Sequence, residues 1–185
     1  MFHFCLFAGT EGEMPPAGMT AITIFGGSEL RRPTLAREIG AWRARRGMPR
    51  SRWRWLFGSD ENLIVTIFGA TCVVEPTLVE EYAAMASLVR SGQVTGEELP
   101  SLLDGLESQI GGRDSYRTLT LFGGCVVRRR SPSRERKALD AAVANGGLDH
   151  RTRSWLETLV EAPRGVRWRA LGELVANPLR APAGA

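Results

Sequence analysis

Arginine and tryptophan residues gather between positions 42 and 55, and this stretch holds the side chains best suited to binding chemistry. Guanidinium groups bind phosphates, and indole rings can stack on nucleic-acid bases. A third basic group lies within residues 164–169, and a second contains Arg128, Arg129, Arg130, Arg134, Arg136 and Lys137. The candidate residues of the first stretch, for nucleic acid or for a partner protein, are Trp42, Arg43, Arg45, Arg46, Arg50, Arg52, Trp53 and Arg54.

The alternation in Arg52-Trp53-Arg54-Trp55 supports a second interpretation of the same stretch. In a strand with one buried face, every second side chain points into the core. The indoles would then close the core, and the arginines would lie solvated over them. The sequence leaves both interpretations open.

Few residues are arranged for catalysis. Asp149-His150 places an acid beside a base, but a nucleophile must also lie nearby. An N-cap aspartate followed by an exposed histidine accounts for this pair without catalysis. Glu80-Glu81 and Glu97-Glu98 each fall in the first turn of an expected helix, where acids complement the helix dipole. We therefore expect no enzyme activity and no catalytic residue.

Cofactor and metal sites are not expected either. The glycine pairs of the chain lack the spacing of a phosphate-binding loop, and a strand rather than a helix follows them. Cys5, Cys72 and Cys125 are odd in number and lack a Cys-x-x-Cys pattern or a neighbouring histidine, so they favour neither zinc nor a disulfide scaffold. Cys72 and Cys125 are offset by one residue in related strands, which predicts that they point to opposite faces.

The elements that must position these residues come from a motif that the chain repeats three times. Recurrence of a motif at intervals of this length indicates one supersecondary unit used repeatedly. Apolar and polar residues alternate in each copy, as in a half-buried strand, and glycine then breaks the strand as a tight corner. The copies are Thr23-Ile24-Phe25-Gly26-Gly27, Thr66-Ile67-Phe68-Gly69-Ala70 and Thr120-Leu121-Phe122-Gly123-Gly124, with structural corners at Gly26, Gly27, Gly69, Gly123 and Gly124.

A helix is predicted after each corner and its second short strand. Thr77 and Glu80 have the spacing of a capping box, and Thr34 and Ser131 hold the corresponding places in the other repeats. In repeats two and three, the N-cap residues Thr95 and Asp149 begin a second helix with apolar spacing of three and four. The first helices are expected to end near Gly47, Gly92 and Gly146.

These patterns predict an α+β fold of three strand–corner–strand units, each followed by a helix or a helix pair. A short β-solenoid stack is one form that the units could take. One domain is expected over residues 19–175, with units at about 20–57, 62–112 and 117–175. Residues 1–18 are expected to be a disordered tail, or to precede a true start at Met14 or Met19. Residues 176–185 are expected to be a flexible tail.

Two segments resemble known bacterial families. The segment Ile24-Phe25-Gly26-Gly27-Ser28-Glu29-Leu30 and its copies resemble the C-terminal domain of LiaF-like, cell-wall-active antibiotic response proteins. In that family such units stack as a small β-helix. The segment from Leu88 to Leu99 resembles the two-helix SHOCT motif. The resemblance implies a non-catalytic interaction module of a bacterium, and it assigns no functional residues.

Charge separates along the chain. Residues 75–114 contain eight acids and two arginines, a net charge of −6, whereas residues 39–59 contain six arginines and no acid. The acidic stretch could dock on a basic patch of another copy. No apolar run is long enough to span a membrane. The sequence thus predicts a cytoplasmic interaction or scaffold protein that binds a protein partner or itself. The alternative is sequence-independent binding of nucleic acid.

Overall fold

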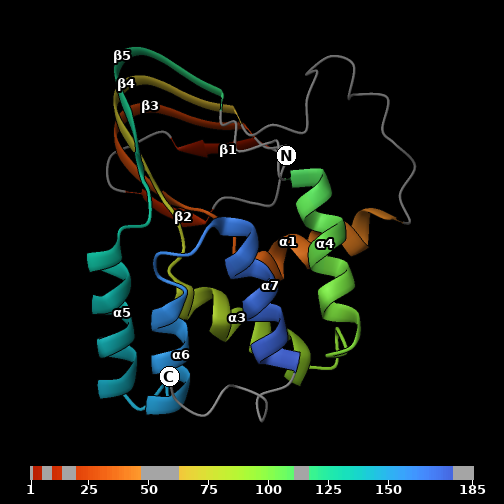
Figure 1. The fold of residues 1–185 in the computed structure, drawn as a ribbon. Helices are drawn as coiled ribbons and strands as arrows, with labels where there is room; N and C mark the ends of the chain where they lie inside the picture. The colour runs from red at the N-terminus through yellow and green to blue at the C-terminus, as the bar shows by residue number, and fades with distance from the viewer. Residues whose placement is uncertain (1, 6–9, 14–19, 47–62, 111–116, 177–185) are drawn as a thin grey trace. The chain divides into compact units, whose positions relative to one another are not determined.

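The computed structural model describes residues 2–5, 10–13, 20–46, 63–110 and 117–176, and it mixes strands and helices in an α+β arrangement (Figure 1). The chain divides into two compact units. The three long strands belong to the first unit. The helices that follow the second and the third of these long strands belong to the second unit. The division therefore runs through the second and third sequence repeats and not between them.

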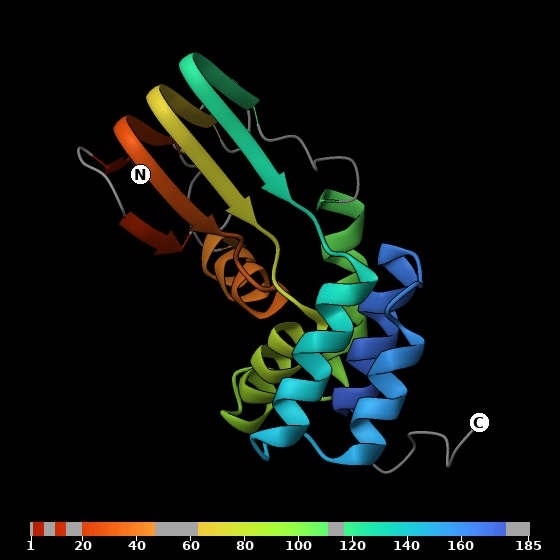
Figure 2. The same cartoon turned by 90° about the vertical axis from the view of Figure 1, so that its left-hand side faces the viewer.

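Three long parallel strands carry the repeated motif: β3 (Thr20–Arg31), β4 (Leu63–Val74) and β5 (Arg117–Arg128). They pair in register, so that Phe25 lies beside Phe68 and Phe68 beside Phe122. Figure 2 shows the three strands side by side, each bent along its length. The sheet that they form is open, and the described strands do not close it into a barrel.

Two short strands lie in the segment expected to be a disordered tail. β1 (Phe2–Cys5) pairs in parallel with the first part of β3, and β2 (Thr10–Glu13) pairs with its last part. Backbone amides and carbonyls on the outer edge of β3 need partners, and these segments provide them. Sequence patterns do not indicate this pairing, because neither segment contains the repeated motif.

The glycine corners are bends within continuous strands and do not separate two strands. Gly26 has a φ of 89° and Gly69 a φ of 132°, a region that favours glycine. A Cβ on Gly69 would lie 1.9 Å from the carbonyl oxygen of Gly26, and one on Gly123 would lie 1.8 Å from that of Gly69. The second residue of each pair is not under this constraint, since a Cβ on Gly27 makes ordinary contact and one on Gly124 meets nothing within 4 Å.

The motif threonines of β3 and β4 are buried at the corner. Thr23 bonds across its own bend to Ser28, and Thr66 bonds to Thr71, each at 2.7 Å between hydroxyl oxygens. These two hydroxyl pairs are joined between the strands, because the Thr71 hydroxyl lies 3.3 Å from the hydroxyls of both Ser28 and Thr23. Because each hydroxyl satisfies another, the inside of the corner can be polar. Beyond the corner, Leu30 and Val73 form the apolar core of this unit.

The helices begin and end close to where the sequence predicts. α1 (Leu35–Arg46) follows β3, α3 (Leu78–Arg90) and α4 (Glu98–Ile110) follow β4, and α5 (Pro132–Ala144) and α6 (His150–Thr158) follow β5. The capping box of Thr77 and Glu80 is present. Ser131 and Asp149 accept backbone N–H groups as N-caps. Gly92 and Gly146 follow the ends of α3 and α5 with positive φ.

A helix that the sequence did not predict, α7 (Arg164–Ala176), packs on α3 and α4. Trp168, expected in the third basic group, is buried in the core with Leu171 and is therefore unable to stack on a ligand. Gly172 allows close approach, since a Cβ there would lie 2.5 Å from the Leu103 side chain. The sequence did not indicate the buried face of this helix, because arginines alternate with its apolar residues.

Asp149 provides a pH-dependent test of the cap of α6. The backbone N–H and the hydroxyl of Thr152 both donate to its carboxylate, at 2.8 and 2.9 Å, and these bonds hold the pKa of Asp149 below its ordinary value of 3.8. The cap is therefore fully stabilising above about pH 4, and the contribution is lost as the pH falls through the lower, folded-state pKa. Asp149→Ala should cost roughly 1 kcal/mol at neutral pH in urea unfolding.

Asp149→Asn is the matched control, because asparagine caps a helix without a charge. We expect the stability difference between the wild type and Asp149→Asn to change as the pH is lowered from 5 to 3, through the range in which the aspartate takes up its proton. A difference that stays constant over this range would contradict the role assigned to the carboxylate.

Candidate interaction surface

Exposed apolar side chains concentrate on the three long strands. Of the large hydrophobic residues that are exposed in the described part of the chain, all but Val166 lie on these strands. Phe25, Phe68 and Phe122 form a row that we call the phenylalanine ridge. The others belong to β5: Leu119, Leu121 and Val126. Exposed apolar side chains concentrated on a few strands are typical of a site that binds another macromolecule.

The phenylalanine ridge is a direct result of the in-register pairing. Parallel strands bring equivalent residues within about 5 Å, a spacing that suits stacked rings. The ring centroids of Phe25 and Phe68 are 5.2 Å apart, and those of Phe68 and Phe122 are 5.0 Å apart, with 6° between the planes of each pair. Phe122 is the last ring of the ridge and its most exposed member, at 67%.

The strand β5 forms one edge of the sheet, and the short strands β1 and β2, which pair with β3, form the other. β3 and β4 have strand neighbours on both sides, whereas β5 pairs only with β4 among the described strands. The side chain of Leu121 in β5 is 60% exposed. Its counterpart in β4, Ile67, is more covered, because it is half-buried. Proteins commonly protect an edge strand with charges or proline, and residues 118–127 contain neither. We call residues 117–128 with their outward side chains the β5 edge.

Cys72 and Cys125 follow the predicted offset of one register position. Cys125 pairs in register with Thr71, and Cys72 pairs with Val126. Cys125 packs against the core of Leu30 and Val73. Burial, with a smaller contribution from Cys72, raises the pKa of the Cys125 thiol above its usual value of 9.0. Because the thiolate is the nucleophilic form, Cys125 is not activated at neutral pH.

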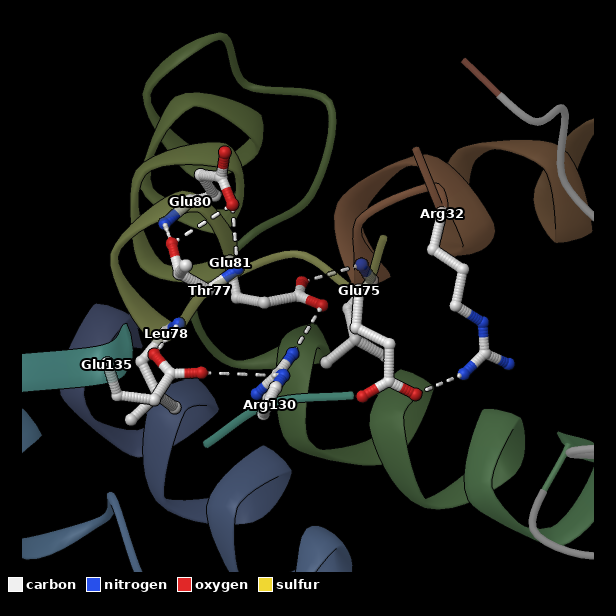
Figure 3. A network of polar contacts seen from close by, with 9 residues as sticks. Arg32, Glu75, Thr77, Leu78, Glu80, Glu81, Arg130 and Glu135 are labelled. Carbon is white, nitrogen blue, oxygen red and sulfur yellow. Dashed lines mark hydrogen bonds and ion pairs between the residues drawn. The ribbon is translucent and has the colours of Figure 1, made fainter. Parts of the chain in front are cut away.

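The second basic group predicted from the sequence is divided by the structure. Arg128 and Arg129 are exposed, and the Arg128 guanidinium lies 3.9 Å from the Glu29 carboxylate. Arg130 is only 12% exposed, because its guanidinium lies 3.1 Å from Glu81 and 3.9 Å from Glu135 (Figure 3). Arg130 is therefore part of the helical core and not of a binding patch.

The Arg/Trp stretch lies largely beyond the residues that the structure describes. Its first part continues α1, which carries Trp42, Arg43, Arg45 and Arg46 in its last turns. The remainder, Arg50, Arg52, Trp53 and Arg54, lies outside the described residues. The two interpretations of this stretch, a binding surface or a cover for the core, both remain predictions.

Buried glutamates connect successive repeats, and sequence reasoning missed them. Glu81 of α3 accepts a hydrogen bond of 2.7 Å from the backbone N–H of Leu35, at the start of α1. Glu135 of α5 accepts one of 2.8 Å from the N–H of Leu78, at the start of α3 (Figure 3). Each glutamate thus caps the first helix of the preceding repeat. The third repeat has Pro132 at that place, which carries no N–H to be capped.

A sequence signal for this network exists. Glu38, Glu81 and Glu135 occur four residues after Thr34, Thr77 and Ser131. A glutamate in the first turn of a helix is also expected at the surface, where it complements the helix dipole. Only the alignment of the three repeats therefore indicates that Glu81 is buried. The network fixes helices and offers no catalytic group.

Comparison with known proteins gives no relative for this chain: no family model, curated protein or solved structure matches it. Within the described ranges, every helix is too short or too polar to cross a bilayer. The candidate surface therefore rests on its own geometry.

Proposed function

We propose that this chain is a non-catalytic interaction module that binds a partner protein through the β5 edge and the phenylalanine ridge. The observation that carries the proposal is the edge strand itself, twelve residues long, with apolar and uncharged residues throughout its interior. Strand addition at such an edge supplies backbone hydrogen bonds and burial of apolar side chains together. In this proposal the three bent strands are coils of a short solenoid stack, as the LiaF-like resemblance implies, and β5 is its open end.

The proposal also agrees with the chemistry of the remaining groups. Inside the helical core, Arg130 forms ion pairs with Glu81 at 3.1 Å and with Glu135 at 3.9 Å. Asp149 caps a helix, and the Cys125 thiol has a raised pKa. These groups are explained by folding, whereas the exposed side chains of Leu121, Phe122 and Val126 are not.

A lysine on the edge strand tests the proposal. We expect Leu121→Lys to weaken partner capture from a lysate of the native host by about tenfold or more, because a charge on an edge strand opposes strand addition. Val166→Lys is the matched control, since Val166 is also exposed, at 55%, but lies on α7. Quantitative mass spectrometry of tagged baits, with and without nuclease, provides the measurement.

Three results are informative. Protein partners that Val166→Lys retains and Leu121→Lys loses would support the proposal. Partners that both variants retain would contradict it. Partners that disappear from every bait with nuclease would contradict it in favour of the alternative function, binding of nucleic acid by the Arg/Trp residues, since that binding does not need Leu121.

A further inference from the structure

We infer that the β5 edge binds an extended segment of another protein in which an aromatic residue is followed directly by glycine, added parallel to β5 and in register with it. This inference rests on the proposed function and adds the chemistry of the partner. It follows from the continuity of the edge with the interfaces between β3, β4 and β5, in which each strand meets the next through the same two contacts.

The first contact requires glycine wherever one long strand follows another at the corner. A Cβ on Gly69 would lie 1.9 Å from the carbonyl oxygen of Gly26, and one on Gly123 would lie 1.8 Å from that of Gly69. Both contacts join equivalent register positions. Glycine inside a strand is typical of a place where another backbone approaches closely. A further strand that repeats this step beside β5 therefore needs glycine next to Gly123.

The second contact is the stacking of rings, and it sets the residue before that glycine. The ring centroids of Phe25, Phe68 and Phe122 follow one another at 5.2 and 5.0 Å. Phe122 is 67% exposed, because β5 has no further neighbour among the described strands. Figure 2 shows β5 at the end of the three long strands. An aromatic residue beside Phe122 on the added strand would continue the stack and cover this ring.

The direction of the added strand follows from the two contacts together. β3, β4 and β5 are parallel, so each phenylalanine and the glycine after it meet their equivalents in the next strand. In an antiparallel strand, the residue after the ring would instead lie beside Leu121. Apolar residues around the aromatic–glycine pair would cover Leu119, Leu121 and Val126, the other exposed apolar side chains of β5.

A second copy of this chain is not expected to provide such a segment. Each strand of a parallel sheet uses opposite sides for its two neighbours, so a strand added to β5 must offer the side that β5 turns towards β4. Among the described strands, this side is covered in β4 and β5, is covered at both ends of β3, and is free in β1 and β2. Neither β1 nor β2 contains an aromatic residue followed by glycine. The sequence between them, outside the described residues, has alanine after phenylalanine, in Phe7-Ala8-Gly9.

Two peptides of identical composition test the inference on the intact chain. The parent is Ile-Val-Thr-Ile-Phe-Gly-Ala-Thr-Ser-Val-Val, the sequence of residues 64–74 with serine in place of Cys72. The second peptide has Phe-Ala-Gly in place of Phe-Gly-Ala, the order found in Phe7-Ala8-Gly9. We expect it to bind about tenfold more weakly or worse in fluorescence anisotropy, because a Cβ would then meet the backbone of Gly123.

A third peptide tests the ring. Leucine in place of its phenylalanine should weaken binding to the wild-type chain about fivefold. The same replacement should have little effect on binding to Phe122→Leu, since that variant lacks the ring on which the peptide stacks. Leu121→Lys should weaken every peptide, and Val166→Lys should weaken none. Circular dichroism of each variant verifies that it is folded before binding is compared.

A nitroxide label on the parent peptide tests the direction of pairing. At the C-terminal end of the peptide, the label should broaden the amide NMR signals of Val126 and Val127. At the N-terminal end, it should broaden that of Leu119. The opposite pattern would mean antiparallel addition and would overturn the inference.

The outcomes separate the inference from the proposed function. Equal binding of the parent and the Phe-Ala-Gly peptide, still lost in Leu121→Lys, would overturn the aromatic–glycine inference and leave the proposed function standing. Binding of no peptide would also overturn the inference, and the lysate experiment then decides the function separately. A dimer in light scattering that Leu121→Lys dissociates would overturn it as well, because a second copy would then be the occupant.

Discussion

Gly69→Ala is expected to destabilise the protein by about 3 kcal/mol or more, a loss of roughly 10 °C in melting temperature for a chain of this size. Two causes act together. The φ of 132° at Gly69 is costly for any residue with a Cβ. That Cβ would also lie 1.9 Å from the carbonyl oxygen of Gly26, a backbone atom that cannot move aside without bending β3.

The control for this prediction lies one strand away. Gly124→Ala changes the second glycine of a corner, where a Cβ meets nothing within 4 Å and φ is not in the positive region. We expect a change in unfolding free energy within about 0.5 kcal/mol for this variant, as for other unconstrained surface positions. Urea unfolding followed by circular dichroism measures both. Equal midpoints for the two variants would show that the close approach of the strands at the corner is not a constraint.

The corner glycines also show what the sequence could predict about the sheet. The repeated Thr-x-Phe-Gly pattern predicted the extended segments and the three bends, because alternation and glycine act locally. It divided each of the continuous strands β3, β4 and β5 into two. It did not predict which threonines are buried. Thr23 is buried because Ser28 and Thr71 approach it in space, and periodicity carries no information on that approach.

For the helices, local sequence signals predicted where a helix begins, but they did not predict which face of the helix is buried. Caps at Thr77, Ser131 and Asp149 depend on residues three positions apart, and the sequence predicted all three correctly. α7 was missed, because the arginines around Trp168 suggested a basic surface. Which face of a helix is covered depends on α3 and α4, which precede it by many residues.

The candidate surface was predicted least well, for a related reason. The sequence marked the three phenylalanines as motif residues, and all three are exposed in the structure. The extent of exposure differs between strands and is greatest for Phe122, on the edge strand. Phe122 and Leu121 are exposed because β5 ends the sheet. The same residue types in β4 are more covered. A site of this kind comes from the order of strands in space, whereas basic clusters such as residues 128–130 stand out in sequence and are then divided by the fold.

Glu135→Ala is expected to have the second large effect, a loss of about 3 kcal/mol in unfolding free energy. Glu135 is fully buried, and its carboxylate accepts the N–H of Leu78 and lies 3.9 Å from the Arg130 guanidinium. Alanine would leave the start of α3 without this acceptor. It would also leave a largely buried guanidinium with Glu81 as its remaining acidic neighbour in this cluster.

Glu135→Gln distinguishes the two contributions. Its amide oxygen can still accept the bond from Leu78, so we expect a loss of only about 1–2 kcal/mol, which reports the missing charge beside Arg130. Glu97→Ala is the control for removing an acid from the start of a helix, because Glu97 is exposed. Its effect should stay within about 0.5 kcal/mol.

A double-mutant cycle then shows whether the buried pair itself matters. If Arg130 is costly once Glu135 is absent, Arg130→Met combined with Glu135→Ala should lose less stability than the two single variants added together. Strict additivity would mean that Glu135 acts only as a cap for Leu78. Glu135 lies in the third repeat and Leu78 in the second. Either result therefore measures how much the contact between these repeats contributes to the free energy of unfolding. A loss from Glu135→Ala no larger than that from Glu97→Ala would contradict this connection between repeats.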